Sequence, residues 1–414
     1  MTDRLYYNDP YLREFDATIR GITERGDQMA VTLDRTAFYP TSGGQPFDTG
    51  TLGEFRVVDV RDENGGGIEH VLETGGGADP RVGSGRTHGS APTPGERVHG
   101  VIDWGRRFDH MQQHTGQHVL SAAFDKLFGV RTVSFHLGAA TSTIDLAREM
   151  TPAEIAAAED DANRIVWEDR PVTIRFASAE DAAAMPLRKE SVRGGTLRLI
   201  DVEGFDLSAC GGTHVARTGA IGIIAVASWE RFKGGQRIEF VCGGRALGRF
   251  RSQRSVIAAG VRLLSVLPEE LPASIERLQA EAKEQKRSMA ALQGELARYR
   301  ADELATTAET IPNGARLVIQ AIDADANGLK SLAVSIAQKP GYIVVLTSTA
   351  RPALIVVARA PDVDVAANRI VAGLIAAFGG RGGGKPDIAQ GGGLDGNSES
   401  ILNRAREDIV QPQL

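Results

Sequence analysis

The chain has 414 residues, of which 42% are hydrophobic and 24% charged, a globular composition that excludes a disordered or collagen-like protein. Its formal net charge of −6 gives no overall nucleic-acid signal, so such contacts must come from local basic patches. Two cysteines cannot form a disulfide scaffold, no apolar run reaches the ~20 residues of a membrane span, and the N-terminus lacks a secretory signal. We therefore expect a cytoplasmic protein of about two to four domains.

Residues 1–97 are predicted to form a small, glycine-rich β-barrel domain. Segments 15–22, 29–34 and 53–60 alternate apolar and polar residues, which is typical of half-buried strands. Residues 75–95 contain many glycines and prolines without apolar periodicity and are expected to be a loop. Several short strands in succession favour an antiparallel barrel or sandwich.

Residues 98–248 are predicted to form an α+β domain. A strand at 98–103 precedes a long helix over 109–128, where proline is absent. Thr151 and Glu154 fit a capping box with Pro152 in the first turn, so a second helix should run to about Trp167. Strands are expected at 172–176 and 196–202.

Residues 249–310 are predicted to be a helical linker. Apolar side chains recur there with alternating spacings of four and three residues over about four heptads. The seam consists of Leu271, Ile275, Leu278, Ala282, Met289, Leu292, Leu296 and Tyr299, and Gln285 is its one polar position. Two arrangements fit this seam. The helix can lie on its own domain as one amphipathic helix, or it can form a coiled coil, either between two chains or as a hairpin.

Residues 311–414 are predicted to form a compact α/β domain. Apolar segments at 316–322, 342–346 and 354–358 alternate with helical segments at 329–338 and 363–378. The predicted fold class is therefore an α+β multidomain protein: an N-terminal barrel, an α+β domain, a long helical or coiled-coil linker and a C-terminal α/β domain.

Histidines concentrate on the first long helix, at His110, His114 and His118. Spacing of four places neighbours on one helical face, where two imidazoles can bind one metal ion. Cys210 and His214 have the same spacing around two glycines, which permit a tight turn. Three or four nitrogen and sulfur ligands from these segments fit zinc. We place His114, His118, Cys210 and His214 in the ligand set.

These segments resemble the editing domain of alanyl-tRNA synthetase. His114-Thr-Gly-Gln-His118 is similar to its first zinc-ligand motif and Cys210-Gly-Gly-Thr-His214 to its second, more specific one. Residues 36–50 look like the glycine-rich segment facing the same pocket, and residues 379–393 resemble the C-terminal domain called DHHA1. Because no aminoacylation core precedes these motifs, the chain resembles the free-standing alanyl-tRNA editing proteins of the long AlaX type.

The resemblance implies a zinc-dependent hydrolase that removes wrongly attached seryl groups, and glycyl groups as a further substrate, from tRNA(Ala). It also implies that Thr36 pairs with the serine hydroxyl, and Gln45 is expected in the same pocket. His110 departs from the pattern of two histidines; it could replace a ligand, orient one, or act as a base. Zinc could activate water or position the substrate, and the sequence leaves both roles open.

Basic residues are expected to bind the tRNA backbone by neutralising phosphates. Those near the editing centre are Arg188, Lys189, Arg198, Arg231, Lys233 and Arg237; those in the C-terminal glycine-rich segment are Arg381 and Lys385. That segment is expected to be a loop whose backbone N–H groups hold phosphates. The C-terminal domain should contact the tRNA away from its acceptor end or support a homodimer, to which the heptad helix could also contribute.

Two other functions are compatible with part of the sequence. A tRNA-binding accessory protein without catalysis needs no metal ligands, so the four-residue set argues against it. A phosphoesterase of the DHH type is suggested by the name of the C-terminal domain, but the sequence contains no Asp-His-His triplet.

Overall fold

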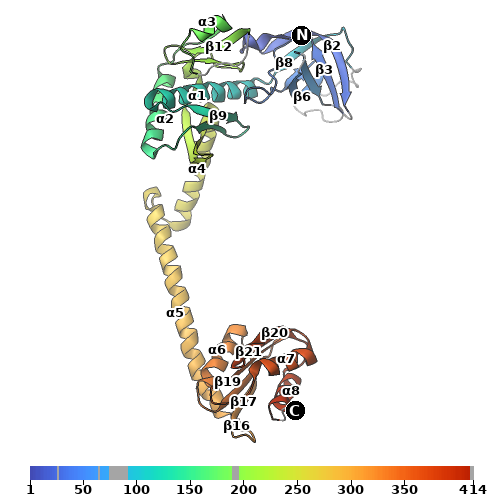
Figure 1. The fold of residues 1–414 in the computed structure, drawn as a ribbon, viewed down its shortest axis with the longest axis vertical. Helices are drawn as coiled ribbons and strands as arrows, with labels where there is room; N and C mark the ends of the chain where they lie inside the picture. The colour runs from blue at the N-terminus through green and yellow to red at the C-terminus, as the bar shows by residue number, and fades with distance from the viewer. Residues whose placement is uncertain (26–27, 64–65, 74–91, 189–194, 411–414) are drawn as a thin grey trace. The chain divides into compact units, whose positions relative to one another are not determined.

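The computed structural model describes residues 1–25, 28–63, 66–73, 92–188 and 195–410 (Figure 1). The chain divides into two compact units, Met1–Ala259 and Gly260–Leu414. None of the helices in the described residues combines the length and apolar character that crossing a bilayer requires.

Six strands of the first unit close into the predicted barrel. Their order around it is β2 (Glu14–Arg25), β3 (Gln28–Leu33), β7 (Ile68–Leu72), β6 (Phe55–Asp62), β5 (Gly50–Leu52) and β8 (Arg97–Ile102). Alternate side chains point inward and form an apolar core. The strand expected at 98–103 is β8, which completes the barrel by pairing with β2 and β5. Beside the barrel, β1 (Asp3–Arg4) pairs in parallel with β4 (Arg35–Thr36). The short 3-10 turn η1 (Leu5–Tyr7) directly follows β1.

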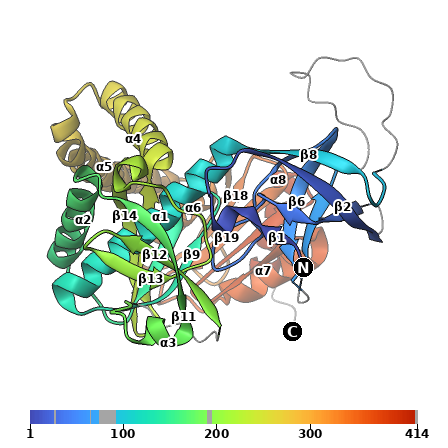
Figure 2. The same cartoon turned by 90° about the horizontal axis from the view of Figure 1, so that it is seen from above.

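The helix α1 (Trp104–Phe128) begins five residues before its predicted start because Asp103 caps it, accepting a hydrogen bond from the Arg106 amide. It contacts a three-stranded and a four-stranded sheet. The first consists of β11 (Val172–Ser178), β12 (Thr196–Val202) and β13 (Asp206–Ala209); the second, in spatial order, of β14 (Ile224–Phe232), β15 (Gly235–Cys242), β10 (Ser142–Leu146) and β9 (Thr132–Leu137). Figures 1 and 2 show α1 running from the barrel toward α2 (Pro152–Trp167). The predicted capping box of α2 is confirmed.

The barrel is fixed to α1 by an ion pair without solvent exposure. Arg107 of α1 donates from Nε to both carboxylate oxygens of Asp48, at 3.1 and 3.0 Å, and from Nη1 to the carbonyl of Pro10 at 2.8 Å. Asp48 also accepts from the Tyr39 amide at 2.7 Å. The segment between Thr36 and Gly50 is thereby held against the helix that carries the histidines.

Two short elements complete the first unit: helix α3 (Ala179–Ala183) after β11, and the 3-10 turn η2 (Thr218–Ile221) before β14. Helix α4 (Gly243–Leu264) follows β15 and crosses the boundary between the units. The 3-10 turn η3 (Pro268–Glu270) then leads into the helix predicted by the heptad pattern, α5 (Leu271–Thr306).

The heptad seam of α5 is not what attaches this helix to its own domain. Besides Ser274, the buried residues of α5 are Ala297, Ala301 and Ala305, and these three alanines belong to a core cluster that includes α6 (Ala326–Ala337). Seam residues such as Met289, Leu292, Leu296 and Tyr299 are exposed. Pairing of two chains through this seam stays a prediction.

The second unit contains the predicted α/β domain, built on a six-stranded mixed sheet. The spatial order is β16 (Glu309–Thr310), β17 (Arg316–Ile322), β18 (Tyr342–Ser348), β19 (Ala353–Arg359), β21 (Ile388–Leu394) and β20 (Arg381–Gly384). Helix α6 contacts β18 and β19, and α7 (Ala367–Phe378) contacts β21, while α8 (Ser398–Val410) contacts α7.

The expectation of a glycine-rich loop at 379–393 was wrong, because this segment is the hairpin of β20 and β21 at the sheet edge. Its glycines permit close strand contact: a Cβ on Gly382 would lie 2.3 Å from the carbonyl oxygen of Gln390. Arg381 and Lys385 are exposed at the start of β20 and at the hairpin turn.

Candidate metal centre

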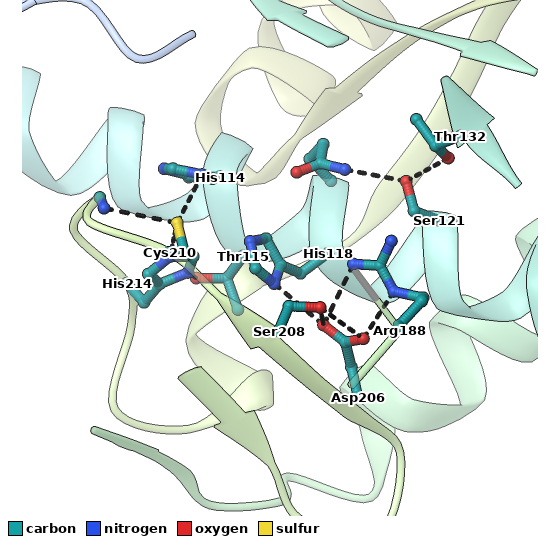
Figure 3. A network of polar contacts seen from close by, with 12 residues as sticks. His114, Thr115, His118, Ser121, Thr132, Arg188, Asp206, Ser208, Cys210 and His214 are labelled. Carbon is teal, nitrogen blue, oxygen red and sulfur yellow. Dashed lines mark hydrogen bonds and ion pairs between the residues drawn. The ribbon is translucent and has the colours of Figure 1, made fainter. Parts of the chain in front are cut away.

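Four side chains from two distant segments converge on one point (Figure 3). His114 and His118 project from α1, and Cys210 and His214 come from the turn after β13; their ligand atoms lie within 4.8 Å of one another. Cys210 Sγ is 3.4 Å from Nε2 of both His114 and His214. Tetrahedral zinc with ordinary thiolate and imidazole bonds would place sulfur and nitrogen about 3.6 Å apart. The donor types and their spacing therefore fit zinc.

Each of the three histidines uses its other ring nitrogen for a hydrogen bond that orients the ring. His114 Nδ1 lies 2.8 Å from Gln45 Oε1, and His118 Nδ1 lies 2.9 Å from Asp206 Oδ2. His214 Nδ1 lies 3.2 Å from the hydroxyl oxygen of Thr115. These partners leave all three Nε2 atoms directed at the cluster. Such contacts fix the tautomer of a metal-binding histidine.

The partners can accept these protons because their own donors are engaged elsewhere. The Thr115 hydroxyl donates to the carbonyl of Met111 at 2.9 Å, so it accepts from His214. Gln45 donates its amide to the Thr213 hydroxyl at 2.8 Å, while its oxygen also accepts from the Thr213 backbone N–H at 3.1 Å. The amide orientation of Gln45 is thereby set.

The electrostatics of the cluster favour a metal-binding thiolate. Burial first, and His114 next, lower the pKa of His214 to about 3, so this ring is neutral. Burial opposes a thiolate at Cys210, but the neighbouring His114 and His214 outweigh it and hold the pKa of Cys210 well below its usual value. Burial also acts against a charged His118, yet hydrogen bonds to Asp206 and Cys210 raise its pKa to about 9. A metal bound to His118 Nε2 would compete with a proton for this nitrogen.

The turn that carries Cys210 and His214 has little room. A Cβ on Gly212 would lie 2.1 Å from the His114 ring, so only glycine lets the turn approach the helix. Arg198 of β12 holds the turn by donating from Nη1 to the carbonyls of Cys210 and Gly212, at 2.7 and 2.9 Å, and from Nε to that of Tyr7 at 2.9 Å. Arg198 is thus a structural clamp between the N-terminal segment and the ligand turn.

The chain matches two known families. Residues 197–239 match the threonyl and alanyl tRNA synthetase second additional domain, and residues 314–411 match the DHHA1 domain. The alanine–tRNA ligase of Pyrococcus abyssi is 34% identical over 94% of this chain but only 42% of its own length, so the chain spans less than half of such ligases. The alanyl-tRNA editing protein AlaX-L of Pyrococcus horikoshii is 31% identical over 99% of this chain and 98% of its own length. The chain belongs to the alanyl-tRNA editing protein family.

The three residues expected to act on the substrate occupy different surroundings. Gln45 is fully buried against His114, where it orients a ligand. Thr36 is fully buried in contact with His70, 2.8 Å from hydroxyl oxygen to Nε2. His110 lies outside the four-residue cluster; burial first, and Arg106 next, lower its pKa to about 4, and its Nδ1 has no hydrogen-bond partner among the described residues.

The basic residues expected to bind tRNA also differ in their surroundings, because some are paired with buried carboxylates and others are exposed. Arg188 donates to Asp206 from Nε at 2.6 Å, which makes it part of the support of His118. Arg237 is paired with Asp145 at 2.7 Å. Arg231 and Lys233 are exposed, and Arg231 pairs with Glu149 at 3.0 Å in the open. Lys189 lies outside the described residues.

Sequence reasoning missed Asp206 and Thr115 as supports of the ligands, and it expected Arg198 to bind tRNA, whereas the structure uses Arg198 to hold the ligand turn. A signal for one of them was present: Asp206, Ser208 and Cys210 are two residues apart along β13 and the turn, so they share one face. Ser208 donates to Asp206 at 3.1 Å. Thr115 gave no comparable signal, because a threonine inside a buried helix is common.

Replacing Asp206 should weaken metal binding while leaving all four ligands in place. In Asp206→Asn the acceptor of the His118 Nδ1 proton loses its charge, and we expect the affinity for zinc to fall about 10–100-fold. Competition with a chromophoric chelator measures this directly. The matched control is Asp145→Asn, which also removes a carboxylate paired with an arginine but lies away from the cluster. An equal loss of affinity in both variants would contradict the assigned role of Asp206.

Proposed function

We propose that the protein is a zinc-dependent hydrolase that removes wrongly attached serine, and secondarily glycine, from tRNA(Ala). The end-to-end match to an alanyl-tRNA editing protein supports the substrate class. The observation that carries the proposal is the cluster itself: three imidazole Nε2 atoms and one thiolate directed at a common point, each ring held by its own partner. A protein that only binds tRNA has no need of this arrangement.

A second hydrolytic site is useful because alanine is difficult to select by size. Serine exceeds alanine by one hydroxyl, and glycine is smaller, so an aminoacylation pocket rejects both incompletely. An editing site can instead use a hydrogen-bonding group that recognises the hydroxyl of serine. Thr36 is our candidate for this group.

Zinc bound at the cluster would supply a Lewis acid to the ester or to water if its coordination expands to five or if one of the four protein ligands is displaced. Each imidazole ring is held in the tautomer that leaves Nε2 free to bind the metal. The side chains that hold the rings are Gln45, Asp206 and Thr115. The Asp48–Arg107 ion pair holds the Thr36–Gly50 segment beside the same helix. Since an aminoacyl ester is already reactive, orientation of this kind can contribute much of the rate.

Incubating the protein with seryl-, glycyl- and alanyl-tRNA(Ala) tests the proposal. We expect the seryl ester to be lost fastest and the alanyl ester to be spared. Tight tRNA binding without deacylation of any of the three would instead support a non-catalytic accessory protein.

Thr36→Val should reduce hydrolysis of seryl-tRNA(Ala) selectively. The substitution keeps the side-chain shape but removes one hydrogen bond to the serine hydroxyl, for which we expect about a 10-fold slower reaction. Hydrolysis of glycyl-tRNA(Ala) should slow less, because glycine has no side-chain hydroxyl. Initial rates on the two substrates give the comparison.

Thr36→Ser is the matched control, since it retains the hydroxyl and should keep most of the preference for serine. Zinc content and circular dichroism of both variants check that the barrel remains folded. Equal losses on both substrates in Thr36→Val would assign Thr36 to support of the segment and not to recognition of serine.

We further propose that the β20–β21 hairpin contacts the tRNA backbone. Arg381 and Lys385 are exposed, and among the described residues neither has an ion-pair partner. Arg381 also lines a pocket together with Gln390 and three glycines of the hairpin. Exposed cations beside an open backbone suit phosphate oxygens.

Arg381→Ala combined with Lys385→Ala should raise the tRNA concentration needed for half-maximal deacylation, with little effect on the rate at saturation. If each cation neutralises one phosphate, the slope of log affinity against log salt should become shallower by about two. Titrations at several salt concentrations measure both quantities. Lys330→Ala, an exposed lysine on α6, is the control; an unchanged slope in the double variant would exclude the hairpin from tRNA binding.

A further inference from the structure

His70 is a buried histidine that the metal cluster does not include. It lies on β7 inside the barrel without solvent exposure, and its ring packs edge-on against Phe38 with centroids 5.5 Å apart. Nδ1 is 3.1 Å from the carbonyl oxygen of Val31, and Nε2 is 2.8 Å from the Thr36 hydroxyl oxygen. Both ring nitrogens are therefore engaged, one with the barrel wall and one with Thr36.

The contacts of His70 determine which nitrogen carries the proton. A carbonyl oxygen can only accept, so Nδ1 must be the donor to Val31. Burial lowers the pKa of His70 to about 4, so the ring is neutral near pH 7 and has one N–H. Nε2 consequently carries a lone pair and can only accept a hydrogen bond.

This tautomer fixes the direction of the Thr36 hydroxyl. The hydroxyl proton must point to His70 Nε2, because that nitrogen has no proton to give. One of the two lone pairs of the hydroxyl oxygen accepts the backbone N–H of Phe38 at 3.1 Å. A single lone pair is left. Thr36 can therefore offer another molecule an acceptor but no donor.

We infer that His70 is a positioning residue for substrate selection, which makes Thr36 an acceptor for the side-chain hydroxyl of serine. This inference rests on the proposed function, in which Thr36 reads the amino acid. A serine hydroxyl can donate to the remaining lone pair, whereas the methyl group of alanine and the hydrogen of glycine cannot. Without His70, the threonine hydroxyl is free to rotate and can bind a water molecule in place of serine.

The place of Thr36 in the fold is consistent with this role. The same segment continues to Tyr39, whose hydroxyl donates to the carbonyl of Ser42 at 3.0 Å. It then reaches Gln45, which contacts His114. The segment thus connects Thr36, which contacts His70 of the barrel strand β7, with Gln45, which contacts His114 of the cluster.

Two substitutions at His70 separate selection from structure. His70→Phe keeps a flat ring but removes the acceptor, and His70→Gln keeps an acceptor oxygen near the place of Nε2. We expect His70→Phe to lower the ratio of seryl to glycyl hydrolysis about 5–10-fold, the size of one hydrogen bond to the substrate. His70→Gln should preserve the ratio to within about twofold. Zinc content, measured in parallel, shows that each variant retains its metal centre.

A double-mutant cycle with Thr36→Val completes the test. In the Thr36→Val background there is no hydroxyl to direct, so His70→Phe should leave the seryl-to-glycyl ratio unchanged. An equal loss on both substrates, or a change of ratio that persists in the Thr36→Val background, would overturn the inference while the proposed function stands. If the unmodified protein hydrolyses neither ester, the proposed function fails first and this inference falls with it.

Discussion

Cys210→Ala is expected to abolish most zinc binding and to slow deacylation by a factor on the order of 100 or more. The thiolate is the one anionic ligand of the set, and it lies 3.4 Å from Nε2 of both His114 and His214. Without it, three neutral imidazoles would hold a divalent ion with no anionic ligand, and the Asp206 carboxylate would act only through His118. Zinc per chain, determined by atomic emission, and initial rates on seryl-tRNA(Ala) measure the two effects.

The second cysteine provides the control. Cys242 is fully buried on β15, and its sulfur packs against Gly116 of α1 on the side away from the ligand turn. Cys242→Ala should cost on the order of 1–2 kcal/mol of stability through lost packing, with unchanged zinc content. Full retention of zinc by Cys210→Ala would remove Cys210 from the ligand set and return attention to His110, the other histidine on this face of α1.

The grouping of His114, His118, Cys210 and His214 was predictable from sequence, whereas most of the residues that support these four side chains were not. Spacing of four between His114 and His118 follows directly from helix geometry, and the Cys-Gly-Gly-Thr-His turn has few alternative uses. The hydrogen bond from His118 to Asp206, in contrast, joins residues 88 positions apart. No local pattern predicts such a contact, because it depends on how β13 packs against α1.

The positions of basic residues in the sequence did not show which of them are free to bind phosphate. Arg188 and Arg237 were expected to bind phosphates, yet both are paired with buried carboxylates. Sequence cannot show whether an arginine has a carboxylate across the sheet from it. The prediction of a loop at 379–393 failed for a related reason. Glycine permits loops, but it also permits strands to lie in unusually close contact.

The second large effect is expected at the junction between the barrel and α1. Asp48→Ala leaves the Arg107 guanidinium buried without its carboxylate, with backbone carbonyls such as that of Pro10 as the remaining partners. Removing one member of a buried ion pair costs about 3–5 kcal/mol, because the other charge stays uncompensated. We expect a large drop in the stability of the first unit, measured by urea denaturation.

Tryptophan fluorescence gives a local reading of this junction in a background in which the other two tryptophans, Trp167 and Trp229, are replaced by phenylalanine. Trp104 starts α1, with its ring 5.5 Å from that of Tyr11 and under the guanidinium of Arg13 at 4.1 Å. Its environment should change in Asp48→Ala at lower urea concentration than the ellipticity of the whole chain. The reverse order would mean that the junction is not the weak point of the variant.

Replacing both partners distinguishes the loss of a favourable interaction from the burial of an unpaired charge. Asp48→Leu combined with Arg107→Met removes both charges and fills similar space, and such replacements of buried ion pairs are often neutral or stabilising. We expect the double variant to be more stable than Asp48→Ala. Its deacylation should nevertheless remain below that of the unmodified protein, because Asp48 also accepts from the Tyr39 amide in the segment that carries Gln45 to His114. Recovered stability with impaired zinc binding would show that the pair positions the metal centre, whereas full recovery of both would reduce it to a stabilising contact.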